Sequence, residues 1–119
     1  MSLISKIFGG GDWTKAAEAA RKLEEQGDPG DALLAYEKLL SEFRGGMPPA
    51  EVAAMEDRAV GLRDRIADRH LAEGGRLLED GEAEAAREEF RVALEVAGSR
   101  AKEQEVQELF NKNVQLNKE

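Results

Sequence analysis

Two stretches of the chain echo each other at a fixed distance, and this echo constrains the fold more than any other feature. Small residues correspond to small residues, an aromatic to an aromatic, and a glycine to a glycine, always at the same 54-residue offset (81 minus 27 for the two glycines). Small and large residues at three- and four-residue spacings are typical of closely packed helices. The echo therefore predicts how helices pair, and it predicts no chemistry. The corresponding positions are Ala20, Leu23, Gly27, Ala32, Tyr36 and Leu40, then Gly74, Leu77, Gly81, Ala86, Phe90 and Leu94.

The rest of the pattern predicts an all-α protein. Apolar residues recur at helical spacing over 13–26, 29–43, 50–80, 83–97 and 100–117, and no stretch alternates as a strand does. Asp28 followed by Pro29 is a helix start signal, and Gly27 and Gly81 mark turns. The expected fold is a set of antiparallel helical hairpins with a long central helix and a C-terminal capping helix.

The first 11 residues are expected to form a separate segment. Leu3, Ile4, Ile7 and Phe8 share one helical face, and three glycines follow at 9–11, which we expect to break the helix and act as a tether. This apolar stripe is a candidate partner-binding site. Three docking sites are open to it. They are the protein's own core, a groove on another protein that takes the stripe as a helix, and a membrane surface on which it is a short amphipathic anchor. The expected domains are thus 1–11 and a single helical domain over 12–119.

A heptad seam occupies the start of the long central helix. The seam steps along one face at alternating three- and four-residue intervals, through Val52, Met55, Ala59, Leu62 and Ile66. The seam packs either on the first hairpin or on a second copy of the chain. We favour the first hairpin, because Tyr36 and Phe43 need cover. The homodimer remains the alternative.

The echoed hairpins resemble the tetratricopeptide repeat family, whose repeat is a pair of antiparallel helices of about 34 residues with fixed small and aromatic positions. The stretches that resemble it are 13–44 and 67–98, and the residues between them exceed the family period. The resemblance implies a TPR-like array with a concave face lined by the first helix of each hairpin. On this face it places the candidate partner-binding residues Ala17, Arg21, Leu71, Gly75 and Leu78.

Charge and composition argue against several other functions. The net charge of −8 and the pI of about 4.8 disfavour a phosphate-tracking nucleic-acid binder. There is no cysteine, and the single histidine, His70, has only Glu73 at ligand spacing, which is too few groups for a metal site. No phosphate-binding glycine loop is present. We therefore expect no enzyme activity, no metal and no cofactor.

Taken together, these observations favour an acidic scaffold or adaptor in a bacterial cytoplasm, with another protein as its partner. The alternatives are a peripheral protein of the inner membrane, anchored by the N-terminal stripe, and a homo-oligomeric structural protein.

Overall fold

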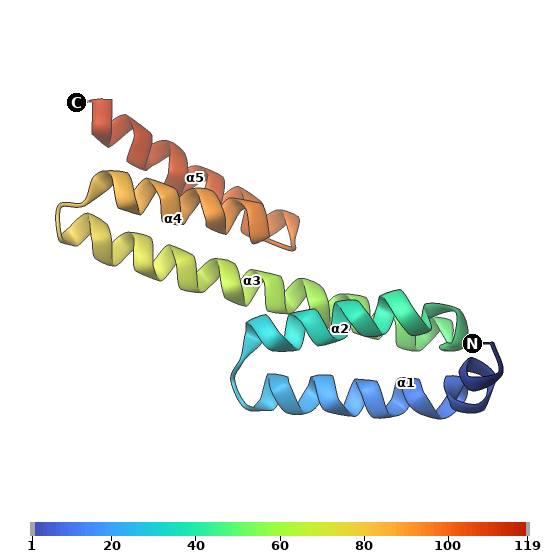
Figure 1. Ribbon diagram of the computed structural model, residues 1–119. Helices are drawn as coiled ribbons and strands as arrows, with labels where there is room; N and C mark the ends of the chain where they lie inside the picture. The colour runs from blue at the N-terminus through green and yellow to red at the C-terminus, as the bar shows by residue number, and fades with distance from the viewer. Residues whose placement is uncertain (1, 119) are drawn as a thin grey trace. The chain divides into compact units, whose positions relative to one another are not determined.

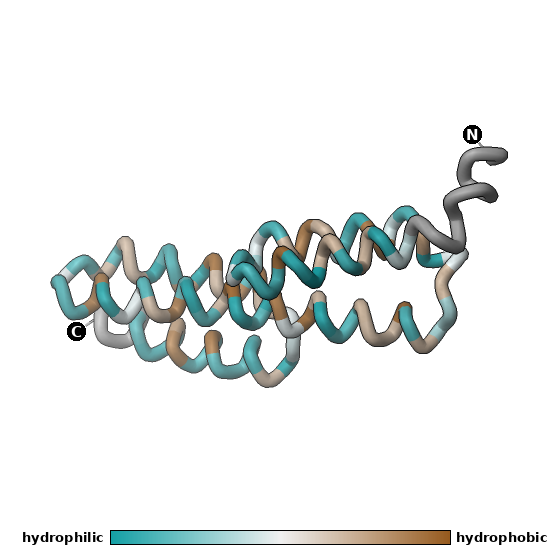
Figure 2. Tube along the Cα trace, turned by 90° about the horizontal axis from the view of Figure 1, so that it is seen from below, coloured by the Kyte–Doolittle hydropathy of each residue, from teal (hydrophilic) through white to brown (hydrophobic). Residues whose placement is uncertain are grey.

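A computed structural model of the chain describes the backbone of residues 2–118 and the side chains of residues 13–113. Over this range the protein is all-helical, as the sequence predicts. The elements are α1 (Ser2–Glu25), α2 (Pro29–Phe43), a short 3₁₀ turn η1 (Arg44–Gly46), α3 (Pro49–Glu79), α4 (Ala83–Val96) and α5 (Arg100–Lys118). Teal and brown alternate along the helices in Figure 2, as expected for amphipathic helices.

The two echoed turns have the same backbone conformation. Gly27 and Gly81 have φ angles of 82° and 81°, a region that side chains with a Cβ rarely adopt. In each turn the glycine N–H bonds to a carbonyl three residues back, and the next N–H bonds to a carbonyl five residues back. This hydrogen-bond pair is the Schellman ending of a helix. The glycines predicted as turns therefore end α1 and α3.

The chain divides into two compact units, Met1–Leu62 and Arg63–Glu119. In the first unit α1 and α2 lie side by side (Figure 1). Asp28 caps α2 by accepting a hydrogen bond from the Asp31 N–H at 3.0 Å, and Pro29 occupies the first turn, as the start signal predicts. Tyr36 and Leu39 of α2 are each only 1% exposed. The α2 face predicted to be apolar thus forms the core of this unit.

Polar contacts also hold the first unit together. The Tyr36 hydroxyl donates to the Glu24 carboxylate at 2.9 Å, and Arg58 of α3 donates to the same Glu24 oxygen at 3.1 Å. A second ion pair joins Arg44 of η1 to Glu56 of α3 at 2.9 Å. The start of α3 is therefore connected to α1, α2 and η1 within this unit.

The second unit has two apolar clusters. Ala67 of α3, Ala93 of α4 and Val106 of α5 form one cluster. Leu77 of α3 forms the other with Ala86 and Phe90 of α4. In Figure 1, α4 and α5 lie side by side, and Phe110 of α5 packs against the second cluster. All three helices of this unit therefore contribute to its core.

Both α3 and α1 continue without a break through glycine residues. α3 is continuous over Pro49–Glu79, although Gly61, Gly74 and Gly75 lie within it. α1 also runs through Gly9–Gly11, where the sequence predicts a break. A glycine inside a helix costs only about 1 kcal/mol relative to alanine, so it weakens a helix without forbidding it. That residues 1–11 form a tethered docking segment stays a prediction.

Candidate interaction surfaces

The first candidate surface is an apolar groove between α1 and α2. It has a volume of about 270 Å³. Three alanines and the edge of Leu39 make up much of its lining, so few side chains fill the space between the helices. Small residues on neighbouring helices allow another helix to approach closely. The lining residues are Ala16, Ala19, Ala35, Lys38, Leu39, Glu42 and Phe43.

Apolar groups remain accessible at and beside this groove. Ala19 is exposed, Phe43 is half-buried, and Leu34 of α2 is 65% exposed, the highest value among the large apolar side chains that the structure describes. Lys38 follows Leu34 by one helical turn, and Glu42 follows Lys38 by another, so a positive and a negative charge border the groove. The groove therefore offers an apolar floor and a charged rim of both signs.

The family resemblance did not identify this groove, because it places the partner surface elsewhere. Of its residues on α1, Ala17 is only 4% exposed and so belongs to the core of the first unit. Arg21 is exposed and forms an ion pair with Glu18 at 2.9 Å, one turn away. An exposed pair of this kind contributes little to stability, so the Arg21 guanidinium can exchange partners at small cost.

The concave-face residues on α3 are partly covered. Leu71 and Leu78 are half-buried, and both pack against the Leu77–Ala86–Phe90 cluster, as does Phe110 of α5. Gly75 is half-buried, and a Cβ added there would meet nothing within 4 Å. The candidate concave-face residues Leu71 and Leu78 are thus part of a packed interface in the second unit.

The residues proposed for a dimer seam face inward to different degrees. Met55 is 5% exposed and Leu62 is 1% exposed, whereas Val52 is half-buried. Little of Met55 or Leu62 is therefore available to a second copy. The side chains of the N-terminal stripe, Leu3, Ile4, Ile7 and Phe8, lie outside the described residues, and their docking stays a prediction.

Some titratable groups pair between helices and others pair within one helix. His70 Nδ1 lies 2.8 Å from the Glu89 carboxylate and so connects α3 to α4, while Glu73 binds Arg76 instead of His70. Over residues 13–113 no three histidine or acidic side chains come together as metal ligands would. The His70–Glu89 pair therefore links α3 to α4, and the Glu73–Arg76 pair stays within α3.

Asp64 of α3 accepts three hydrogen bonds from the loop between α4 and α5. Its carboxylate accepts hydrogen bonds from the Gly98 N–H at 2.8 Å, from the Ser99 N–H at 3.0 Å and from the Ser99 hydroxyl at 2.6 Å. Burial alone would raise the pKa of Asp64, but the hydrogen bonds from Ser99 and Gly98, together with the charge of Lys102, lower the pKa below its ordinary value. Asp64 thus fixes the loop between α4 and α5 to α3.

Comparison with protein-family models, with curated proteins and with solved structures finds no match to this chain. Among the described helices, none has the length and apolar character needed to cross a membrane.

Two features of the sequence are consistent with the groove between α1 and α2. Leu34 stands beside Leu33, outside the three- and four-residue spacing that defines the buried face of its helix. Ala16 and Ala19 form a small-residue ridge on α1 next to the echoed Ala20. An extra apolar residue on one helix and small residues on the next indicate a surface groove only once the pairing of α1 and α2 is known.

Proposed function

We propose that this protein is a non-catalytic protein–protein interaction module, and that the groove between α1 and α2 binds an amphipathic helix of another protein. The observation that carries the proposal is the apolar floor of this groove beside the exposed Leu34. In helix-in-groove binding, apolar side chains spaced three and four residues apart on the ligand fill such a floor. In this proposal the two hairpins form a degenerate TPR-like array.

The charges on the rim define the ligand further. Lys38 and Glu42 lie one turn apart, so a ligand helix with an acid near Lys38 and a base near Glu42 matches both. Such rim charges set the direction of the ligand more than they add to affinity. The expected ligand is therefore an apolar-faced helix with charges of both signs along one edge.

The proposal is tested by selecting ligands from a displayed library of amphipathic helical peptides on the full-length protein. The expected ligands carry apolar residues at i, i+3 or i+4, and i+7. Ala19→Glu places a charge on the exposed groove floor and should weaken their binding by about tenfold or more, since burying an unpaired charge is costly. Ala54→Glu, at an exposed α3 position outside the groove lining, is the matched control and should leave the dissociation constant unchanged.

Two results would contradict this function. One is that no peptide is enriched above an unrelated helical protein of similar charge. The other is equal binding to the Ala19→Glu and Ala54→Glu variants. Light scattering on the same samples tests the homodimer, because a mass of twice 13.0 kDa that falls to 13.0 kDa in Ala19→Glu would assign the groove to a second copy.

A further inference from the structure

Asn113 of α5 is buried without hydrogen-bond partners. Its side chain is 1% exposed, and neither its amide nitrogen nor its amide oxygen has a partner. It follows Val106 and Phe110 at helical spacing, so these three residues share the inward face of α5. A buried amide with no partner favours any conformation in which water reaches it. Asn113 therefore weakens the packing of this part of α5.

The other end of α5 is held firmly. Ser99 and Gly98 bind the Asp64 carboxylate, and the Ser99 hydroxyl accepts a hydrogen bond from the Lys102 N–H at 3.1 Å, which caps α5. The Lys102 amino group binds Asp68 of α3 at 2.6 Å. The side chain of Lys102 is 17% exposed, while that of Asp68 is exposed to water. The first turn of α5 is thus attached to α3 through two side chains of α3.

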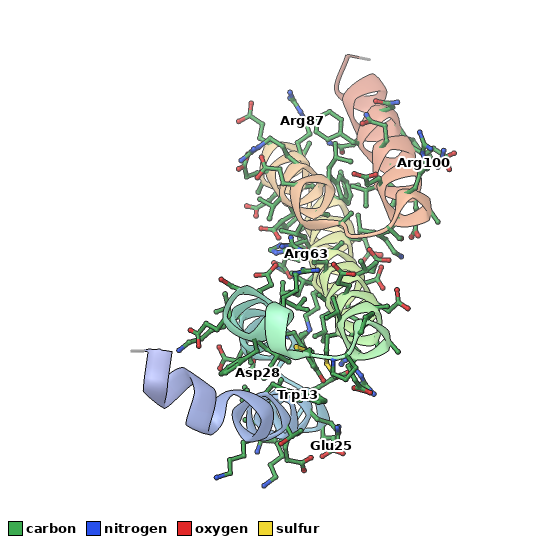
Figure 3. The ribbon with its side chains drawn as sticks, turned by 90° about the vertical axis from the view of Figure 1, so that its right-hand side faces the viewer. Trp13, Glu25, Asp28, Arg63, Arg87 and Arg100 are labelled. Carbon is green, nitrogen blue, oxygen red and sulfur yellow. The ribbon has the colours of Figure 1, made fainter. Side chains whose placement is uncertain are left out.

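No comparable contact holds the part of α5 that carries Asn113. Over residues 103–113 the polar side-chain contacts stay within α5 itself, as in the Gln107–Asn111 hydrogen bond at 2.9 Å. Phe110 is half-buried and lines a groove of about 300 Å³ beside α4. Arg87 of α4, labelled in Figure 3, lines the same groove. Val106 packs in the Ala67–Ala93 cluster just before this part of α5, and within 107–113 Phe110 packs against the Leu77–Ala86–Phe90 cluster.

We propose that α5 is a hinged cap, whose far part over residues 107–113 opens away from α3 and α4 while its first turn stays attached at Asp64 and Asp68. The asymmetry follows from the contacts just described. One end has charged and capping hydrogen bonds, and the other buries an amide that regains its hydrogen bonds with water on opening. The motion goes beyond the α1–α2 groove of the proposed function, and it occurs within the second unit alone.

Opening changes which surface the second unit exposes. Phe110 leaves the Leu77–Ala86–Phe90 cluster, against which it packs in the closed form. The cap thus alternates between a closed form, in which Phe110 packs on this cluster, and an open form, in which water reaches Phe110 and the cluster. The unpaired Asn113 amide destabilises the closed form, and this reduces the free-energy difference between the closed and open forms.

Hydrogen exchange of the full-length protein, followed amide by amide with NMR, tests the hinge. Exchange of protected amides follows the free energy of the opening that exposes them. The amides of 107–113 should exchange at least tenfold faster than those of 103–106, and those of α3 and α4 should be the slowest. Asn113→Leu removes both unpaired polar groups and keeps a side chain of similar size, so it should slow exchange over 107–113 by about tenfold.

Asn111→Leu is the matched control, because Asn111 is exposed two residues away and the substitution is identical; the Gln107–Asn111 hydrogen bond that it removes is exposed and contributes little. It should leave exchange over 107–113 unchanged within about threefold. Asn113→Ala serves as the second variant should leucine be too bulky, and it should also slow exchange. Uniform exchange along 103–113, or exchange that neither Asn113 variant slows, overturns the hinged cap.

Discussion

At the level of single residues, Gly74 marks a position where α3 and α4 approach closely. A Cβ added to Gly74 would lie 2.5 Å from a ring carbon of Phe90 and 2.8 and 2.9 Å from two others. The echoed position in the first unit is Ala20, which is fully buried and whose Cβ is accommodated. Both hairpins therefore have a small residue at this position because the surrounding packing is close. The second hairpin leaves less space there, since even a Cβ would contact Phe90.

Gly74→Ala should destabilise the protein although it favours helix formation. The clash with the Phe90 ring requires the ring or α4 to move, which costs about 1–3 kcal/mol in a packed core. Chemical denaturation monitored by circular dichroism measures the change in the free energy of unfolding.

Gly75→Ala is the control for Gly74→Ala, since it lies in the same helix and its Cβ meets nothing within 4 Å. It should stabilise the protein by about 0.5–1 kcal/mol through helix propensity. If the two substitutions change stability by equal amounts, close packing against Phe90 is not what retains Gly74.

At the level of elements, the start of α5 depends on a carboxylate from another helix. Asp64 accepts three hydrogen bonds from Gly98 and Ser99, and its pKa is lower in the folded protein than its ordinary value of 3.8. A group with a lowered folded pKa contributes stability that is complete above its unfolded pKa. This contribution is lost as the pH falls through the folded pKa, so it fades below about pH 4.

Asp64→Asn should remove this part of the acid sensitivity. The variant keeps a side-chain oxygen as acceptor but loses the charge, so at pH 7 it should be less stable by about 1–3 kcal/mol. Its free energy of unfolding should fall less between pH 5 and pH 2 than that of the wild type. Asp57→Asn, at an exposed carboxylate of the first unit, is the comparison. A wild-type pH profile for the Asp64 variant would contradict the assignment.

The elements also show how far the sequence alone determines this fold. Gly27, Gly81 and the Asp28–Pro29 start signal predict helix ends correctly, because capping and positive φ are local properties. The continuity of α1 through Gly9–Gly11 was not predicted, since a glycine only lowers helix stability. The burial of Asn113 was not predicted for another reason. It reads as part of a polar surface, and its burial depends on how α5 packs in the second unit.

The candidate groove was less predictable than the helices that form it. Each lining residue is ordinary in the sequence, and the alanines of α1 are typical of any packed helix. The groove exists because residues on α1 and α2 meet across the hairpin, which depends on the pairing of two helices and not on either alone. A sequence pattern therefore predicts the hairpin, while the surface it presents requires the structure.

At the level of the whole molecule, two compact units share one continuous helix. Both apolar clusters of the second unit are built only from its own residues, and each ion pair described above joins residues of one unit. α3 contributes its first part to Met1–Leu62 and its remainder to Arg63–Glu119. We therefore expect each unit to have its own local free energy of unfolding, although α3 runs through both.

Hydrogen exchange of the Gly74→Ala variant measures how strongly the units are coupled. The substitution disturbs Phe90 in the second unit, so peptides from α4 should exchange about tenfold faster than in the wild type. Peptides from α2, in the first unit, should keep their wild-type rates. Gly27→Ala should give the reverse pattern, because a Cβ is strained at a φ of 82° and this turn ends α1. Equal acceleration of α2 and α4 in both variants would instead show that α3 makes the two units unfold as one.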